Sequence, residues 1–127
     1  MPRIAIVEDD ERLADDLELE LSSAGYEVVV AYDGLAGLAA IENQPPDLII
    51  CDVMMPEMDG HELVRRLRIT RPALMARVPF VFLTALGMRG DINRGRIAGA
   101  AEYLVKPVDF DVLQTVIGRL LNEEKAP

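Results

Sequence analysis

Groups that could do chemistry stand directly after four short apolar runs of the sequence. They are Glu8, Asp9 and Asp10 after the first run, Asp52 after a central run, Thr84 after the next one, and Lys106, followed by Pro107, after the last. The carboxylates could together hold a divalent cation. With the hydroxyl and the ammonium group beside it, one of these acids could then act as a nucleophile and accept a transferred group. This requires a fold that brings the ends of the runs together.

Three carboxylates in one pocket need positive charge beside them. Two carboxylates about 4 Å apart repel by about 4 kcal/mol at an effective dielectric constant near 20. The repulsion would therefore either raise the pKa of at least one of these acids or be relieved by a bound cation. Mg²⁺ (or Mn²⁺) suits such a set of oxygen ligands. With Lys106 as further countercharge, Asp52 could attack phosphorus, and Thr84 could donate a hydrogen bond to the resulting acyl phosphate.

Short strand-like runs alternate with longer helical patterns along the chain. The expected strands are residues 3–7, 27–31, 48–51, 79–83 and 103–105. The apolar positions that mark helices span residues 13–24, 35–41, 63–67, 91–98 and 110–121. Five strands alternating with five helices predict an α/β fold with one parallel sheet covered by helices on both faces. In such sheets ligands bind outside the carboxyl ends of the strands, which is where the reactive groups stand.

Several neighbouring residues have simpler interpretations. Asp10 is expected to cap the first helix, and Asp59-Gly60 to form a turn that starts the third. His61, the single histidine, is expected to be solvated. The loop methionines could form a partner surface or pack the loop, and both interpretations stay open: they are Met54, Met55 and Met58.

The composition is that of one globular domain. The chain has 127 residues, half of them hydrophobic, and a formal net charge of −9, which argues against direct nucleic-acid or anionic-membrane binding by this domain. Cys51 is the only cysteine, expected as a buried thiol without a disulfide.

No apolar stretch approaches the roughly 20 residues of a membrane span, and the chain opens on a strand, so a cytoplasmic location is expected. Residues 1–122 are expected to form the domain and 123–127 a tail or the start of a linker.

Four motifs together resemble a bacterial two-component response-regulator receiver domain of the chemotaxis-regulator-like kind. The motifs are Ile6-Val7-Glu8-Asp9-Asp10, the run from Asp52-Val53-Met54-Met55-Pro56 to Asp59-Gly60, Thr84-Ala85, and Tyr103-Leu104-Val105-Lys106-Pro107. The resemblance extends from about Arg3 to Leu121, nearly the whole chain. It implies a flavodoxin-like, doubly wound five-stranded sheet in the order 2-1-3-4-5.

The resemblance also implies roles for the site residues. Asp52 would be the phosphoacceptor, loaded from the phosphohistidine of a histidine kinase or phosphotransfer protein. Glu8, Asp9, Asp52 and the backbone carbonyl of Met54 would hold Mg²⁺, while Thr84 and Lys106 would contact the phosphoryl group.

A switch is implied as well. Thr84 would move toward the phosphate and the ring of Tyr103 would turn inward behind it, altering the surface of the fourth helix, fifth strand and fifth helix, through which a phosphorylated homodimer could form. The fourth helix, residues 91–98, is weakly apolar and bracketed by glycines, so we expect it to be mobile and to move on activation. The resemblance also implies a cis Lys106-Pro107 bond, which the sequence can accommodate because only a bond before proline adopts the cis form readily.

Two other functions are less consistent with the residues. An aspartate-nucleophile phosphatase needs a second Asp two residues after the nucleophile, where this chain has Met54, and a cap insertion for which there is no room. A flavodoxin-like cofactor binder needs a phosphate-cradling loop after the first strand, where this chain is acidic. A signalling switch with self-catalysed phosphotransfer and autodephosphorylation, and not an enzyme, is therefore favoured. Met54 and Glu57 could tune dephosphorylation, and residues 69–78 are expected to form a solvated connection.

Overall fold

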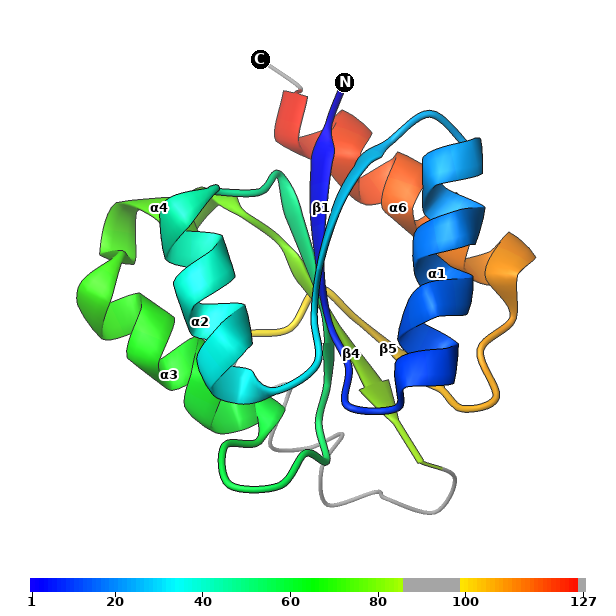
Figure 1. The fold of residues 1–127 in the computed structure, drawn as a ribbon. Helices are drawn as coiled ribbons and strands as arrows, with labels where there is room; N and C mark the ends of the chain where they lie inside the picture. Colours follow the sequence, from blue (N-terminus) through cyan, green and yellow to red (C-terminus); the bar gives the residue numbers. More distant parts are fainter. Residues whose placement is uncertain (86–98, 126–127) are drawn as a thin grey trace.

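Five apolar runs form the strands of one parallel sheet in the computed structural model, which describes residues 1–85 and 99–125 (Figure 1). The strands are β1 (Arg3–Val7), β2 (Glu27–Ala31), β3 (Leu48–Asp52), β4 (Phe80–Thr84) and β5 (Glu102–Val105). Their spatial order is β2-β1-β3-β4-β5, with every neighbouring pair parallel. The predicted α/β class and strand order are confirmed. The order reverses between β1 and β3, and ligand sites of such sheets lie at this switch point.

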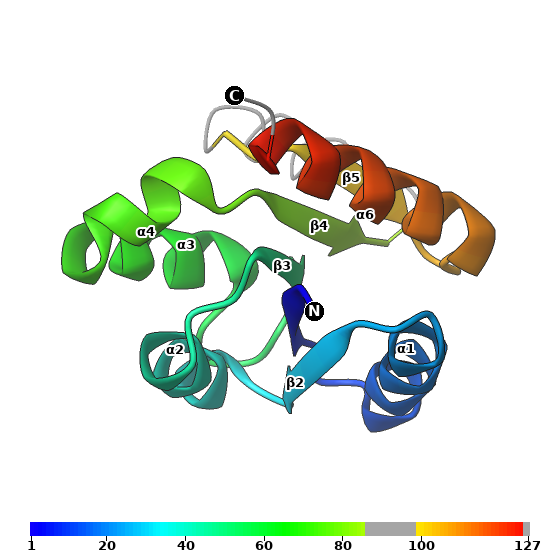
Figure 2. The same ribbon diagram turned by 90° about the horizontal axis from the view of Figure 1, so that it is seen from above.

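Helices cover both faces of the sheet, as Figure 2 shows from above. They are α1 (Glu11–Ser23), α2 (Gly34–Asn43), α3 (Gly60–Thr70), α4 (Pro72–Arg77) and α6 (Phe110–Lys125). One core cluster joins the sheet to α2, α3 and α4, and a second joins its other face to α1 and α6. Each helix with a regular apolar stripe therefore buries that stripe against the sheet.

Local sequence signals fix where the helices begin and end. The side chains of Asp10, Asp33 and Asp59 each accept a hydrogen bond from a backbone N–H three residues later, at the starts of α1, α2 and α3. Gly25 follows α1 with a φ of 99°, a left-handed conformation that glycine adopts without steric cost. The predicted helix cap at Asp10 and the predicted helix start at Asp59-Gly60 are confirmed.

The two central strands, β3 and β4, are buried along their whole length. Cys51 lies in β3 and is fully buried, and this burial raises the pKa of its thiol well above the usual value. The prediction of a buried thiol is confirmed.

The segment at residues 69–78 is mostly exposed, as predicted for a solvated connection, but it also has structure that we did not predict. It contains the short helix α4, with a proline at its first turn, and Leu74 is only 3% exposed. Leu74 packs into the same core cluster as α3 and the start of β4, together with Val78. One buried leucine within six residues was too short a pattern to show helical periodicity.

Other predictions about elements lie outside the described residues. The predicted helix at 91–98, and its motion on activation, belong to the segment 86–98. At the carboxyl terminus α6 continues to Lys125, and the domain boundary at residue 122 stays a prediction. None of the helices in the described part of the chain has the length and apolar character needed to span a membrane.

Candidate functional site

The sheet itself fixes the backbone of the candidate site. Asp52 and Thr84 end β3 and β4, while Glu8 and Lys106 directly follow β1 and β5. The N–H of Glu8 donates to a β2 carbonyl at 3.0 Å, and that of Lys106 donates to the carbonyl of Thr84 at 2.8 Å. Hydrogen bonds of the sheet type therefore continue past the strand ends and hold the reactive residues along one edge.

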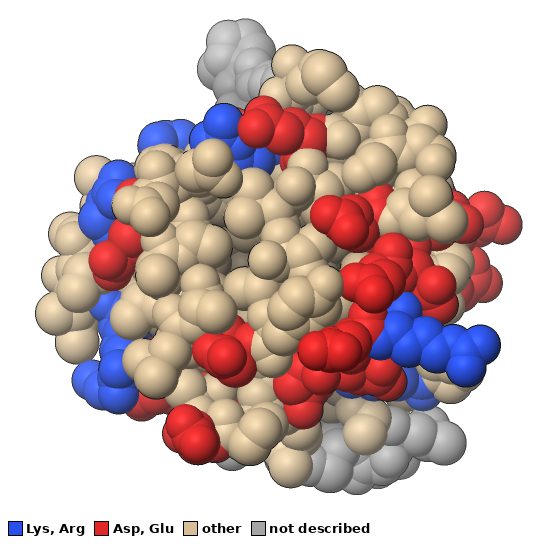
Figure 3. All heavy atoms as spheres, in the orientation of Figure 1, with Lys and Arg blue, Asp and Glu red and all other residues tan. Residues whose placement is uncertain are grey.

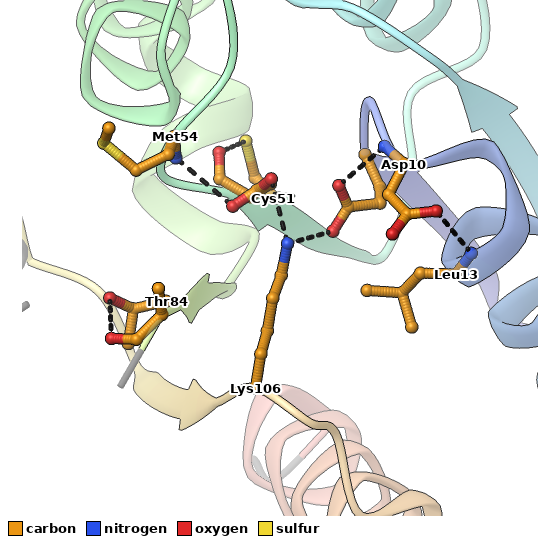
Figure 4. A network of polar contacts seen from close by, with 9 residues as sticks. Asp10, Leu13, Cys51, Met54, Thr84 and Lys106 are labelled. Atoms are coloured by element: carbon orange, nitrogen blue, oxygen red, sulfur yellow. Dashed lines mark hydrogen bonds and ion pairs between the residues drawn. The ribbon is translucent and has the colours of Figure 1, made fainter. Parts of the chain in front are cut away.

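Lys106 joins two buried carboxylates (Figure 4). Its Nζ lies 2.8 Å from Oε1 of Glu8 and 3.1 Å from Oδ2 of Asp52. Glu8 is fully buried and Asp52 is 3% exposed, so this contact holds charges that would otherwise lack solvation. The sequence prediction that residues from separate strand ends meet is confirmed for these three.

The electrostatics of Asp52 follow from this crowding. Burial, together with the hydrogen bond and negative charge of Glu8, raises the pKa of Asp52 from 3.8 to about 7, although Lys106 acts in the opposite direction. For Lys106, burial lowers the pKa, but its contacts with Glu8 and Asp52 outweigh burial and leave the pKa raised. A raised pKa is one of the two outcomes that we expected from crowding the acids; the other, a bound cation, stays a prediction.

Three carboxylates of this site are close enough to share a cation. Glu8, Asp9 and Asp52 each offer an oxygen, and these oxygens all lie within 4.8 Å of one another. Asp9 is exposed, so an ion held here would keep access to water, as Mg²⁺ usually does. This donor set and its surplus of negative charge fit a hard divalent cation.

Backbone N–H groups orient two of these carboxylates. The N–H of Asp10 donates to Oε2 of Glu8 at 3.0 Å, and the N–H of Met54 donates to Oδ1 of Asp52 at 3.2 Å. The side chain of Asp10 is used in the cap of α1, so its contribution to the site is through the backbone.

The two predicted switch residues lie on neighbouring strands. Thr84 is buried, and its hydroxyl lies 3.5 Å from the carbonyl oxygen of Ala85; within the described residues it makes no hydrogen bond to Asp52. Tyr103 is half-buried, with its ring centroid 6.5 Å from that of Phe82. Thr84 thus stands at the edge of the sheet that carries the site, Tyr103 lies on the neighbouring strand against Phe82, and the switching role of the pair stays a prediction.

His61 is not the solvated residue that we predicted. It is half-buried, and its ring packs edge-on against Phe82 with centroids 5.0 Å apart. Its position in the first turn of α3 faces the core side of the helix, a placement that a single histidine in a sequence does not show.

The loop methionines divide between packing and exposure. Met55 and Met58 are buried in the core cluster, which supports the loop-packing interpretation for both. Met54 is 56% exposed, and the packing interpretation does not account for it.

Gly60 positions Asp52 in a way that sequence reasoning missed. A Cβ at Gly60 would lie 2.7 Å from the carbonyl oxygen of Asp52 and 3.1 Å from Cε1 of Phe82. The N–H of Gly60 also donates to the carbonyl of Val53 at 3.0 Å. Only a residue without a side chain lets α3 start this close to the end of β3. The sequence signal for this was Asp59-Gly60 itself, which we interpreted only as a turn and helix start.

The Lys106-Pro107 bond is cis, as predicted. The side chain of Lys106 points from the end of β5 toward the carboxylates (Figure 4).

Comparison with known proteins gives one consistent family. A family model described as the response regulator receiver domain matches residues 4–118. The chain is 40% identical over 122 residues to the DNA-binding dual master transcriptional regulator RpaA of Synechocystis sp., covering 96% of this chain and 50% of that protein. The chain thus spans about half the length of the curated relatives that it matches.

Solved structures agree in fold. A CheY-like response regulator receiver domain protein from Methanospirillum hungatei is 32% identical, with a TM-score of 0.89 over 98% of this chain and 97% of that chain. The chemotaxis protein CheY4 of Vibrio cholerae is also 32% identical, with a TM-score of 0.86 over 94% of this chain and 98% of that chain.

Proposed function

Because this chain belongs to the response regulator receiver domain family, we propose that Asp52 is its phosphoacceptor and that it receives a phosphoryl group from a histidine kinase or phosphotransfer protein. Membership of the family makes the chain part of two-component signalling. The assignment to Asp52 is supported by the contact of this buried carboxylate with Lys106 at 3.1 Å.

The proposed transfer is a displacement at phosphorus. A carboxylate oxygen of Asp52 forms a bond to phosphorus while the bond from phosphorus to the donor imidazole nitrogen breaks, and the leaving nitrogen takes up a proton from water, leaving an acyl phosphate and a neutral imidazole. Lys106 offsets the charge of Asp52 and of the incoming phosphoryl oxygens. Glu8 acts as a positioning residue, because it holds the ammonium group of Lys106 at 2.8 Å.

The proposed metal is Mg²⁺ (or Mn²⁺), held by Glu8, Asp9, Asp52 and the backbone carbonyl of Met54. When bound, the ion supplies positive charge that offsets the negative oxygens of the phosphoryl group. The clustered oxygens of the three acids support this proposal.

The proposed readout is the switch of Thr84 and Tyr103. Their altered positions would change the surface formed by residues 91–98, β5 and α6, through which a phosphorylated homodimer could assemble. Residues 91–98 lie outside the described part of the chain, so this readout rests on the adjoining strands. The chain would act as a signalling switch with self-catalysed phosphotransfer and autodephosphorylation, located in the cytoplasm, and its effector is left open.

The observation that carries the proposal is the meeting of Glu8, Asp52 and Lys106 from three strand ends. Acetyl phosphate with Mg²⁺ should add one phosphoryl group to the intact protein, as measured by mass spectrometry, and Asp52→Ala should abolish the addition. Excess chelator should do the same to the wild-type protein. Equal phosphorylation of Asp52→Ala would rule out Asp52 as the acceptor.

A further inference from the structure

Charge is unevenly distributed over the helices of this acidic chain. The segment 60–77, which covers α3 and α4, contains five arginines and a single glutamate, whereas α1 contains five acids and a single arginine. Figure 3 shows Lys and Arg gathered on the side of α3 and α4, and Asp and Glu gathered over α1. A basic surface on a chain of net charge −9 is a local feature, and the proposed function does not use it.

A pocket of about 360 Å³ opens within this basic surface. Its lining includes Arg68 and Arg77 at the ends of α3 and α4, and the apolar side chains of Met75, Phe80 and Leu120. Phe80 begins β4, so the pocket lies near the amino end of that strand, whereas Asp52 lies at the carboxyl end of β3. We call this pocket the α3–α4 groove.

Most of the five arginines are held by contacts within the chain. Arg65 and Arg66 pair with Glu62 at 2.6 Å and 3.0 Å, and Arg71 donates to a carbonyl of α2 at 3.1 Å. Arg77 makes no such contact with any residue that the structure describes, and its side chain is exposed. A charge placed at the edge of a pocket and not used inside the fold is available to a partner.

Arg68 presents its charge beside an aromatic wall. Its guanidinium carbon lies 5.6 Å from the centroid of the Phe80 ring. A guanidinium over a ring keeps its charge, so Arg68 adds positive potential to the pocket beside Arg77. Basic residues in the last turn of a helix also complement its dipole, but that effect does not require a pocket between them.

The openness of the groove favours a protein segment over a free metabolite. Arg68, Ala76 and Arg77 are all exposed, so a ligand seated among them would stay partly in water. Small-molecule sites usually bury about 70–90% of their ligand. An extended segment of a protein, in contrast, can bind an open groove by placing only a few of its side chains there while the rest of the segment stays in water.

We propose that the α3–α4 groove binds an acidic segment of a partner protein, whose carboxylates pair with Arg77 and are attracted by the charge of Arg68, while an apolar side chain packs against Met75 and Phe80. This interaction is separate from the phosphorylation of Asp52. It gives the domain a second surface, at the opposite end of the sheet from its reactive carboxylate.

A peptide titration tests the groove directly. The ¹⁵N-labelled full chain is titrated with the blocked peptide Glu-Leu-Glu-Glu-Leu-Glu, and the amide signals of Met75, Ala76, Val78 and Ala101 are followed by NMR. We expect saturable shifts there and at least tenfold weaker binding of the matching glutamine peptide. Citrate and inorganic phosphate are run as small-anion probes, and binding of either as tight as that of the peptide would overturn the assignment to a protein segment. No shifts at these amides, or shifts only on other helices, would overturn the site.

Matched variants separate the groove from general charge effects. Arg77→Gln should weaken peptide binding at least fivefold, whereas Arg12→Gln, the same charge change on α1, should leave it unchanged. Ala76→Glu places a negative charge at the rim without altering an arginine and should weaken binding similarly. Equal effects of Arg77→Gln and Arg12→Gln, or unchanged binding by Ala76→Glu, would contradict the proposal. Phosphorylation by acetyl phosphate should be the same in all three variants.

Discussion

At the scale of single residues, Lys106 has the largest expected effect, because it contacts two buried carboxylates at once. Lys106→Met should slow phosphorylation by acetyl phosphate about 10²-fold, since it removes the positive charge beside the attacking oxygen. Arg119→Met is the matched control, because it breaks an exposed ion pair with Glu102. Mass spectrometry over time measures both rates, and a wild-type rate for Lys106→Met would contradict the assigned role.

Asp52 should make the metal-free protein less stable as the pH rises. Its pKa is about 7 in the folded chain and near 3.8 when unfolded, so the folded state binds more protons between these values. The contribution of protonated Asp52 to the free energy of unfolding is fully present below about pH 4. It is lost as the pH rises through 7, where the folded protein also releases this proton.

Asp52→Asn, which carries no such charge, should therefore be more stable than the wild type at pH 8. The expected gain is on the order of 2–4 kcal/mol, since each pKa unit corresponds to about 1.4 kcal/mol, and it should shrink toward zero at pH 4. Urea unfolding in excess chelator at both pH values measures this difference. A wild type that is as stable as the variant at pH 8 would show that Lys106 already neutralises the carboxylate.

Glu57 adopts a left-handed conformation, with a φ of 69°. Such a backbone costs a non-glycine residue about 1 kcal/mol and a β-branched residue more. Glu57→Gly should raise the free energy of unfolding by up to about 1 kcal/mol, and Glu57→Val should lower it by at least about 1 kcal/mol. Chemical denaturation gives the order directly, and equal stability of the two variants would argue against the strain.

At the scale of elements, the start of α3 against β3 is the contact that the site depends on. Gly60→Ala forces a Cβ to within 2.7 Å of the Asp52 carbonyl and should cost about 1–3 kcal/mol of stability, with slower phosphorylation. Gly118→Ala is the matched control in α6, where a Cβ meets nothing within 4 Å, and should stabilise by about 0.5–1 kcal/mol. Thermal unfolding measures the stability of both variants. Equal changes in stability would mean that the close approach of Gly60 to Asp52 does not require a glycine.

The elements also show what the sequence could and could not predict. Helix starts at Asp10 and Asp59 were predictable because capping is local chemistry that depends on residue type. The helix α4 was not, because six residues give too little periodicity, and its formation depends on Leu74 reaching a core built by distant strands. His61 was missed for the same reason, since its partner Phe82 is 21 positions away along the chain.

At the scale of the whole molecule, parallel strands explain why the site was predictable as a group. Strands that run in one direction place their carboxyl ends along one edge, so Glu8, Asp52 and Lys106 had to gather there once five strands were recognised. The strand order and the residue roles came from the family resemblance, and the comparisons confirm the family. Exact contacts, such as the sharing of one ammonium group by two acids, depend on side-chain packing that no sequence pattern specifies.

The most direct test of the central claim is a crystal structure of the chain soaked with magnesium and beryllofluoride. The account predicts beryllofluoride attached to the carboxylate of Asp52, a magnesium ion shared by Asp52 with the acids that follow β1, and Lys106 in contact with a fluorine. An empty pocket under these conditions, with Asp52 directed away from Asp9 and Lys106, would contradict it.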